Sequence, residues 1–188
     1  QILQGRYITY PKIEPLLSDF DYKQVGTSAK GLPIHTLTMG SGPNKVLMWS
    51  QMHGNESTST KGIMDVMCFL KANPTLLEPF TIQLIPMLNP DGAAAYTRLN
   101  ANAIDLNRDA QQQSQPETLA LFKVYDAFQP DYCFNLHDQR TIFGVDGNPC
   151  ILSYLSPAAD ESKAITKARE QAMGSIGHIN EHLQEQLP

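Results

Sequence analysis

Residues 46–72, VLMWSQMHGNESTSTKGIMDVMCFLKA, decide how the chain folds. The stretch opens with four consecutive apolar side chains, a pattern typical of a strand with both faces covered, and it predicts a strand over 46–53. Farther on, apolar residues recur every three or four positions, which predicts an amphipathic helix over 58–72. A buried strand followed by such a helix is typical of α/β proteins.

The same alternation extends outward in both directions. Apolar and β-branched residues predict further strands at four segments: 33–39, 81–88, 131–137 and 150–155. A second helix is expected over 114–128, opened by a capping box of Ser114 and Glu117, and a long polar helix over 156–186. We therefore predict an α/β fold, with a mixed, mostly parallel sheet covered by helices on both faces, in a single domain over residues 1–188.

The composition limits the classes of partner. The 188 residues are 41% hydrophobic, enough for one sizeable core, and 14 basic against 19 acidic residues leave a net charge of -5. No lysine or arginine cluster interrupts this balance, so we expect neither nucleic acid nor an anionic membrane surface as a partner. No apolar segment approaches the roughly 20 residues of a membrane span, and we expect a soluble protein. The compartment stays open, because the sequence begins with Gln1 rather than Met.

The three cysteines are widely spaced and odd in number: Cys68, Cys133 and Cys150. This arrangement matches neither a disulfide framework nor a thiolate zinc motif. We interpret them as buried small hydrophobic residues.

Polar segments follow three of the predicted strands: HGNE at 53–56, NPDG at 89–92 and HD at 137–138. Ligands of open α/β sheets bind beyond the carboxyl ends of the strands, so these segments are the candidates for a functional site. The second has the composition of a turn, and we expect it to shape a loop without touching substrate. Asp91 is therefore left out of the predicted site.

Two imidazoles and one carboxylate form a common ligand set for a hydrolytic zinc ion, with a fourth position for water. His53, Glu56 and His137 supply this set. Alone, the His-x-x-Glu pattern also fits a surface ion pair or a helix cap, and a histidine at a strand end can bond to backbone. The position of the pattern between an apolar strand and a helix favours the metal. The other histidines are interpreted as solvated or structural: His35, His178 and His182.

The segment RLNANAIDLNRD at 98–109 adds a fourth motif. Together with HGNE, NPDG and the NLH of residues 135–137, in this order and at these separations, it resembles the zinc carboxypeptidase (carboxypeptidase A-like) family. The resemblance extends from about residue 46 to about residue 155 and implies the fold of that family.

The resemblance implies a role for each matching residue. It implies one Zn²⁺ held by His53, Glu56 and His137. Asp105 matches the carboxylate that orients the first histidine, as ligating imidazoles commonly require. Arg98 matches the arginine that polarises the scissile carbonyl and stabilises the oxyanion. The pair Asn107 and Arg108 matches the residues that hold the terminal carboxylate of the substrate.

The implied function is metallocarboxypeptidase activity: hydrolysis of a peptide or amide bond adjacent to a free C-terminal carboxylate, with a peptide or N-acyl amino acid as substrate. The family also uses a downstream general-base glutamate and a tyrosine, and the sequence reaches Pro188 before either is expected. The later carboxylates lie in a polar helical pattern and look solvent-facing: Glu161, Glu170, Glu181 and Glu185. We interpret the chain as part of a longer enzyme, incomplete at its C-terminus, rather than a naturally short relative.

Alternatives remain at the level of activity. Asp138 and Gln139, directly after the second histidine, depart from the residues common in peptidases of the family and leave the substrate subclass open. One alternative is an amidohydrolase acting on N-acyl amino acids or murein peptides. Another is a binding module for zinc or peptide that has little or no turnover.

Overall fold

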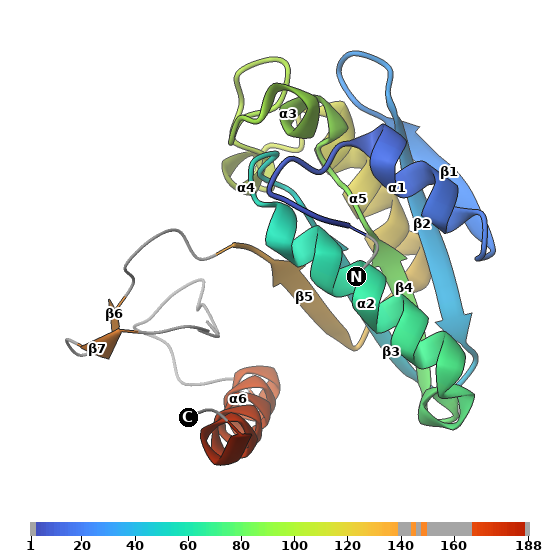
Figure 1. The fold of residues 1–188 in the computed structure, drawn as a ribbon, viewed down its shortest axis with the longest axis vertical. Helices are drawn as coiled ribbons and strands as arrows, with labels where there is room; N and C mark the ends of the chain where they lie inside the picture. The colour runs from blue at the N-terminus through green and yellow to red at the C-terminus, as the bar shows by residue number, and fades with distance from the viewer. Residues whose placement is uncertain (1–2, 139–143, 146–147, 150–166, 187–188) are drawn as a thin grey trace. The chain divides into compact units, whose positions relative to one another are not determined.

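The computed structural model describes residues 3–138, 144–145, 148–149 and 167–186 (Figure 1). The chain divides into two compact units, Gln1–Asp138 and Gln139–Pro188, each of which is described by itself. A five-stranded sheet forms the centre of the first unit. Its strands are β1 (Tyr22–Thr27), β2 (Pro33–Gly40), β3 (Asn44–Ser50), β4 (Phe80–Ile85) and β5 (Tyr132–Leu136).

The strands lie in the order β1-β2-β4-β3-β5. β3 pairs in parallel with both β4 and β5, whereas β2 is antiparallel to β4 and β1 is antiparallel to β2. The sheet is therefore mixed, as predicted. Because β3, β4 and β5 run in the same direction, their carboxyl ends meet at one edge, and the polar segments that follow them are brought together there.

Helices cover both faces of this sheet. They are α1 (Tyr10–Leu17), α2 (Ser57–Ala72), the 3₁₀ helix η1 (Pro74–Leu77), α3 (Pro90–Ala95), α4 (Leu106–Asp109) and α5 (Pro116–Phe128). One apolar cluster joins α1 and α2 to the sheet through Leu84, and a second joins α4 and α5 to it through the adjacent Ile85. Successive strand residues point to opposite faces, so a continuous apolar run is needed when both faces are buried.

The predicted elements of the first unit are present with small differences at their ends. The strand expected over 46–53 ends at Ser50. The helix expected over 58–72 is α2, and the four residues of its apolar stripe are buried: Ile63, Met64, Met67 and Leu70. Five elements of this unit were not predicted: α1, β1, η1, α3 and α4. The predicted strand over 150–155 lies outside the described residues.

The predicted capping box at α5 is wrong. Gln115 occupies the N-cap position, and the Ser114 hydroxyl donates to Asp109 instead of capping the helix. Glu117 is fully buried, and its carboxylate accepts a hydrogen bond from Asn100 at 3.1 Å. Asp109 accepts the backbone N–H groups of Ser114 and Gln115, so the residues before the helix are held by a carboxylate from α4.

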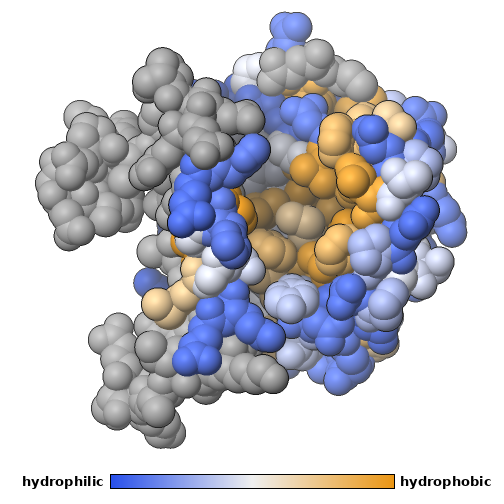
Figure 2. Space-filling view, turned by 90° about the horizontal axis from the view of Figure 1, so that it is seen from below, coloured by the Kyte–Doolittle hydropathy of each residue, from blue (hydrophilic) through white to orange (hydrophobic). Residues whose placement is uncertain are grey.

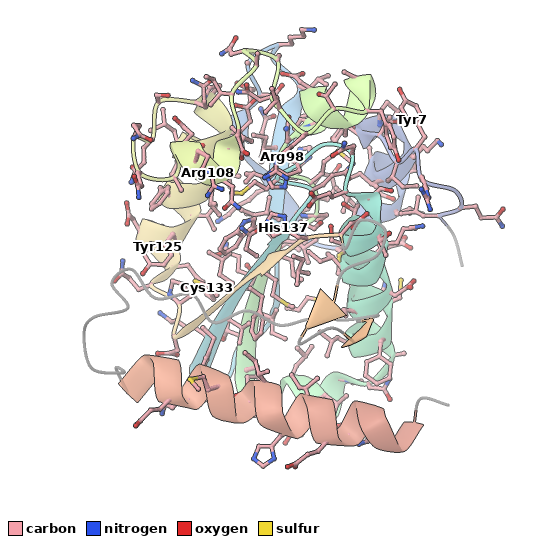
Figure 3. All side chains as sticks on the ribbon, turned by 90° about the vertical axis from the view of Figure 1, so that its left-hand side faces the viewer. Tyr7, Arg98, Arg108, Tyr125, Cys133 and His137 are labelled. Atoms are coloured by element: carbon pink, nitrogen blue, oxygen red, sulfur yellow. The ribbon has the colours of Figure 1, made fainter. Side chains whose placement is uncertain are left out.

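The interpretation of the cysteines as buried is also wrong for the two that the structure describes. Cys68 and Cys133 are both exposed. Cys68 follows the fully buried Met67 on α2, and one helical step of about 100° turns it away from the core. Cys133 lies on β5, a strand at the edge of the described sheet (Figure 3). Cys150 lies outside the described residues.

The described part of the second unit contains β6 (Gly144–Val145), which pairs antiparallel with β7 (Asn148–Pro149), and α6 (Lys167–Gln186). α6 corresponds to the later part of the helix expected over 156–186, whose earlier part lies outside the described residues. Its His178 side chain is 87% exposed, as expected for a solvated histidine. Within the described ranges, no helix combines the length and apolar character needed to cross a membrane.

Hydrophobic side chains gather on part of the surface shown in Figure 2. Large apolar side chains of the first unit that are at least a third exposed include Phe69 on α2, Phe80 on β4 and Phe134 on β5. Exposed apolar side chains are common on protein surfaces, so single ones identify no site.

Candidate metal centre

Three predicted site residues are delivered by β3 and β5. These strands are parallel neighbours with Ser50 opposite Leu136, so the segments that leave their carboxyl ends start side by side. His137 directly follows β5, and His53 lies in the short loop after β3. Glu56 occupies the N-cap position of α2, at the end of the same loop.

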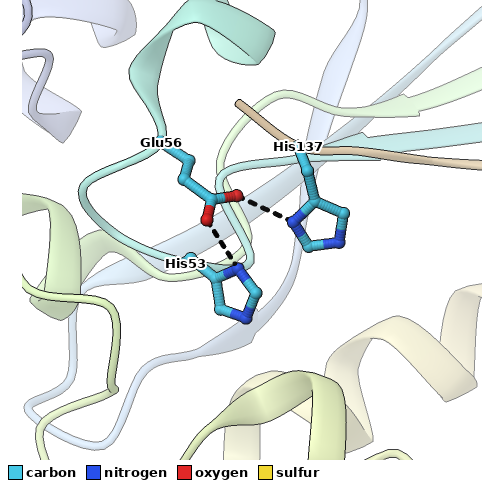
Figure 4. Close-up of side chains that lie close together, drawn as sticks. All are labelled: His53, Glu56 and His137. Atoms are coloured by element: carbon cyan, nitrogen blue, oxygen red, sulfur yellow. Dashed lines mark hydrogen bonds and ion pairs between the residues drawn. The ribbon is translucent and has the colours of Figure 1, made fainter. Parts of the chain in front are cut away.

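The ligand atoms of these residues converge (Figure 4). His53 Nδ1 lies 3.0 Å from Glu56 Oε1, and His137 Nδ1 lies 2.7 Å from Glu56 Oε2. All three ligand atoms lie within 4.8 Å of one another. His53 and Glu56 are buried, whereas the His137 side chain is 31% exposed. One side of the centre is therefore open to solvent.

The loop that carries His53 and Glu56 is closely packed. Gln51 takes a left-handed conformation with φ of 50°, and its side-chain amide donates to the Gly54 carbonyl at 2.7 Å. Gly54 lies directly against α3, where an added Cβ would come within 1.9 Å of the Gly92 backbone. Only glycine fits at this position without moving one of the two segments.

The NPDG segment supports this loop. Asn89 caps α3 by accepting the Gly92 N–H at 2.8 Å, and its amide donates to the Met52 carbonyl at 3.2 Å. Asp91 is buried and accepts the Lys30 N–H at 2.9 Å. The segment begins a short helix rather than forming only a turn, and its contacts hold the loop that presents His53.

Asp105 and Arg98 lie beside the three candidate ligands. Asp105 Oδ1 lies 3.1 Å from His53 Nε2, and Asp105 Oδ2 accepts a hydrogen bond from Arg98 Nε at 3.0 Å. Arg98 Nη1 is also 3.5 Å from Glu56 Oε1. Asp105 caps α4 as well, by accepting the Asn107 N–H at 2.9 Å. A single carboxylate thus fixes an imidazole, a guanidinium and a helix end.

Asn107 and Arg108 follow Asp105 on α4. The Asn107 side chain is half-buried and Arg108 is exposed. In the view of Figure 3, Arg98 and Arg108 both lie above His137. Arg108 lies on α4, and the start of this short helix is fixed by the hydrogen bond from the Asn107 N–H to Asp105.

A buried network that the sequence did not predict shapes the 98–105 loop. The Asn100 side-chain oxygen accepts the N–H groups of Asn102 and Ile104, and its amide donates to Glu117 and Gln115. The sequence pattern predicts only a helix-capping role for Glu117. The Ser114–Glu117 spacing carries no signal for this role, because the partners of Glu117, Asn100 and Ala29, lie 17 and 88 residues earlier.

The hydrogen bonds keep the carboxylates ionised. Burial raises the pKa of Glu56, but hydrogen bonds from His137 and His53 outweigh it and lower the pKa to about 2. Burial likewise raises the pKa of Asp105, yet hydrogen bonds from His53 and Arg98 bring it below the usual value. Glu56 is held as an anion between two imidazoles, and Asp105 between an imidazole and a guanidinium; an ionised carboxylate beside two imidazoles forms a site suited to a cation.

The donor set fits a zinc ion. An ionised Asp105 can only accept, so it favours the His53 tautomer with the proton on Nε2; in that tautomer Nδ1 does not donate to Glu56, and its lone pair is available to a metal ion. Two acceptors 3.0 Å apart require a proton or a metal ion between them. Ligand atoms around a tetrahedral zinc ion, with bonds of about 2.0 to 2.2 Å, lie roughly 3 to 4 Å apart.

Comparison with known proteins identifies the family. A family model described as zinc carboxypeptidase matches residues 17–175, most of the chain. The chain belongs to the zinc carboxypeptidase family. Among curated relatives, probable carboxypeptidase 2 of Arthroderma benhamiae is 29% identical over 101 residues. That match covers 50% of this chain but only 19% of the relative, so the chain spans a minor part of the relative's length.

Solved structures share the fold. The metallo-carboxypeptidase of Burkholderia cenocepacia superposes with a TM-score of 0.65 at 22% identity, covering 70% of this chain and 41% of that one. A metallo-carboxypeptidase of Pseudomonas aeruginosa, solved in complex with (2-guanidinoethylmercapto)succinic acid, gives 0.61 at 23% identity, covering 69% and 39%. These matches confirm the predicted carboxypeptidase-like α/β fold.

Proposed function

We propose that this chain carries the zinc site and the carboxylate-anchoring residues of a metallocarboxypeptidase, with one Zn²⁺ held by His53, Glu56 and His137. The observation that carries the proposal is the convergence of both histidine Nδ1 atoms on the two oxygens of Glu56, at 3.0 and 2.7 Å. Membership of the zinc carboxypeptidase family supports the choice of metal. When bound, zinc polarises a substrate carbonyl and lowers the pKa of a coordinated water to about 7.

Asp105 has the role of orienting His53 in this proposal. Its hydrogen bond to Nε2 holds the ring in the tautomer that leaves Nδ1 free to ligate, and partners of this kind are common around metal-bound histidines. The second oxygen of Asp105 binds Arg98, so the same residue aligns the imidazole with the guanidinium.

Arg98 has the role of stabilising the oxyanion. Its Nε is held by Asp105 while its side chain remains 41% exposed, so N–H groups on the terminal nitrogens can reach a ligand. A guanidinium fixed before the reaction begins stabilises charge that develops in the transition state without reorganising.

Arg108 and Asn107 have the role of binding the terminal carboxylate of the substrate. The exposed guanidinium of Arg108 can form two parallel hydrogen bonds with a carboxylate. The succinic acid derivative bound to the Pseudomonas aeruginosa relative also carries carboxylates, which supports this class of ligand. We therefore propose a peptide or an N-acyl amino acid with a free carboxylate as substrate.

The general base is proposed to come from outside the described residues. At the centre, Glu56, Asp105 and Asp138 are each engaged by imidazole, guanidinium or backbone N–H groups. A positioned general base typically contributes about 100- to 10,000-fold in rate. A zinc-dependent binding module with little turnover is therefore the second candidate function for the chain taken by itself.

Metal analysis tests the zinc site. The unchanged chain and H178A, which removes an exposed histidine of α6, should each bind one equivalent of zinc, whereas H53A should bind none. Equal zinc in H53A and the unchanged chain would reject the ligand assignment.

A substrate panel then separates the functions. Blocked dipeptides, N-acylated amino acids and cell-wall peptides are assayed with the zinc-loaded protein. Preferred cleavage of blocked dipeptides supports a carboxypeptidase, and preference for either other class supports an amidohydrolase. Binding of all three without cleavage supports the binding module.

A further inference from the structure

The first turn of α2 is capped from a distant part of the chain. Glu56 occupies the N-cap position, but its side chain makes no capping hydrogen bond because its carboxylate is turned to His53 and His137. A helix begins with backbone N–H groups that have no partner inside the helix, and an N-cap side chain usually accepts those of the second or third residue. At α2 these residues are Thr58 and Ser59.

Asp138 takes these two N–H groups. Its Oδ2 accepts the Thr58 N–H at 3.0 Å and its Oδ1 accepts the Ser59 N–H at 2.9 Å, across separations of 80 and 79 residues. Its own backbone N–H lies 3.3 Å from Glu56 Oε2 and donates to it. The two residues are therefore reciprocal: Asp138 caps the helix that Glu56 begins, and its backbone binds the Glu56 carboxylate.

We propose that Asp138 is a positioning residue for the metal centre, which fixes Glu56 and His137 relative to each other by capping α2 from the end of β5. The proposal rests on the zinc site proposed above. Asp138 directly follows His137, so its two hydrogen bonds tie the end of β5 to the start of α2. They also release Glu56 from the capping role that its position would otherwise give it.

Charge supports this division of roles. The N-terminus of a helix carries a partial positive charge, equivalent to roughly +0.5, which favours a carboxylate beside it. Asp138 meets this charge through both of its oxygens, leaving the Glu56 oxygens to the imidazoles. Without Asp138, the free N–H groups of α2 compete with His53 and His137 for Glu56. The centre is then less well ordered before the metal binds, which lowers affinity.

Asp131 provides a matched control. It directly precedes β5, as Asp138 follows β5, and its carboxylate accepts the Lys45 N–H at 2.8 Å. D131A therefore removes a carboxylate-to-backbone hydrogen bond at the other end of the same strand, separated from the ligand His137 by the five residues of β5. A general effect of loosening β5 should appear in both variants, and an effect on metal geometry only in D138A.

The experiment measures zinc affinity by chelator competition and the visible absorption of the Co²⁺-substituted protein. D138A should lose about 10- to 100-fold in zinc affinity, the usual effect of removing a residue that orients metal ligands, and its Co²⁺ bands should shift. D131A should retain both the affinity and the bands. D138N, which keeps the shape and one acceptor oxygen, should fall between D138A and the unchanged chain.

Each outcome decides the proposal. Unchanged affinity and Co²⁺ bands in D138A, or equal losses in D131A, overturn it. If D138A does not fold, D138N decides: weaker zinc binding with shifted bands supports the role, and unchanged binding overturns it. If zinc binding depends on His53 but not on Asp138, only the positioning role fails. If H53A binds zinc as well as the unchanged chain, the proposed site fails and the role fails with it.

Discussion

His53 and Asp105 are joined by a contact of 3.1 Å between Nε2 and Oδ1, which leaves His53 Nδ1 facing Glu56. The substitution D105N tests this relationship, because an amide can present either an acceptor or a donor to the ring and carries no charge. We expect zinc affinity to fall by about 10- to 100-fold. Chelator competition measures the effect, and an unchanged affinity would contradict the orienting role of Asp105.

Arg98 is expected to affect catalysis more than metal binding. R98A in the active protein should lower kcat by about 100- to 1000-fold, the range for loss of one oxyanion donor, while zinc content stays near one equivalent. R98K keeps the positive charge but not the planar guanidinium with its several N–H donors, so it should recover only part of the rate. Steady-state kinetics with parallel metal analysis checks this. A variant with full kcat would exclude the oxyanion role.

Arg108 is expected to affect substrate affinity in a way that depends on the carboxylate. R108A should weaken binding of a peptide with a free C-terminus by about 1.5 to 3 kcal/mol, the range for a hydrogen bond to a charged group. The same peptide with an amidated C-terminus should bind both proteins equally. Calorimetric titration of the two peptides measures the difference. Equal losses for both peptides would mean that Arg108 does not contact the carboxylate.

Gly54 and Gly62 give a paired test of loop packing. An added Cβ at Gly54 would come within 1.9 Å of the Gly92 backbone, whereas at Gly62 on α2 it would meet nothing within 4 Å. G54A should therefore lower the free energy of unfolding and displace His53, with loss of zinc binding. G62A should stabilise the protein by up to about 1 kcal/mol, because alanine is the better helix former. Urea unfolding measures the free energy of unfolding of both variants. If G54A were as stable as G62A, the close packing of Gly54 against Gly92 would be contradicted.

The metal-free protein should lose stability in acid through Glu56. Its pKa is about 2 when folded, against an ordinary value of 4.5, so its contribution is fully present above pH 4.5. That contribution is lost as pH falls from about 4.5 towards 2, because the unfolded chain takes up the proton first. When a chelator keeps both proteins metal-free, the free energy of unfolding of E56Q should fall less steeply with decreasing pH than that of the unchanged protein. The difference over this window should be up to about 1.4 kcal/mol per pH unit. If the free energy of unfolding depended on pH equally in the two proteins, the lowered pKa of Glu56 would be refuted.

The sequence predicts those parts of the fold that local patterns determine. The apolar run of β3 and the helical stripe of α2 are both local patterns, so burial of β3 on both faces and of α2 on one face could be expected before the structure was known. α1 and β1 were missed because their signals are weak. α1 is only eight residues long and contains Pro15, and the β1 strand is interrupted by Gly26 at an irregularity of register.

In the site, too, local sequence patterns could be predicted and long-range contacts could not. His53 and Glu56 lie three residues apart after a strand, so the sequence suggested a shared ligand site, and the structure brings His137 to within bonding distance of Glu56. The partners that organise them are long-range. Asp138 reaches α2 across 80 residues and Glu117 reaches Asn100 across 17. One sequence without the fold does not reveal which residues these carboxylates contact.

The most direct test is an anomalous difference map from crystals of the protein grown with zinc and measured at the zinc absorption edge. We expect one peak about 2.0 to 2.2 Å from His53 Nδ1, His137 Nδ1 and an oxygen of Glu56. A peak bound by other residues, or ordered side chains that enclose no peak at saturating zinc, would contradict it.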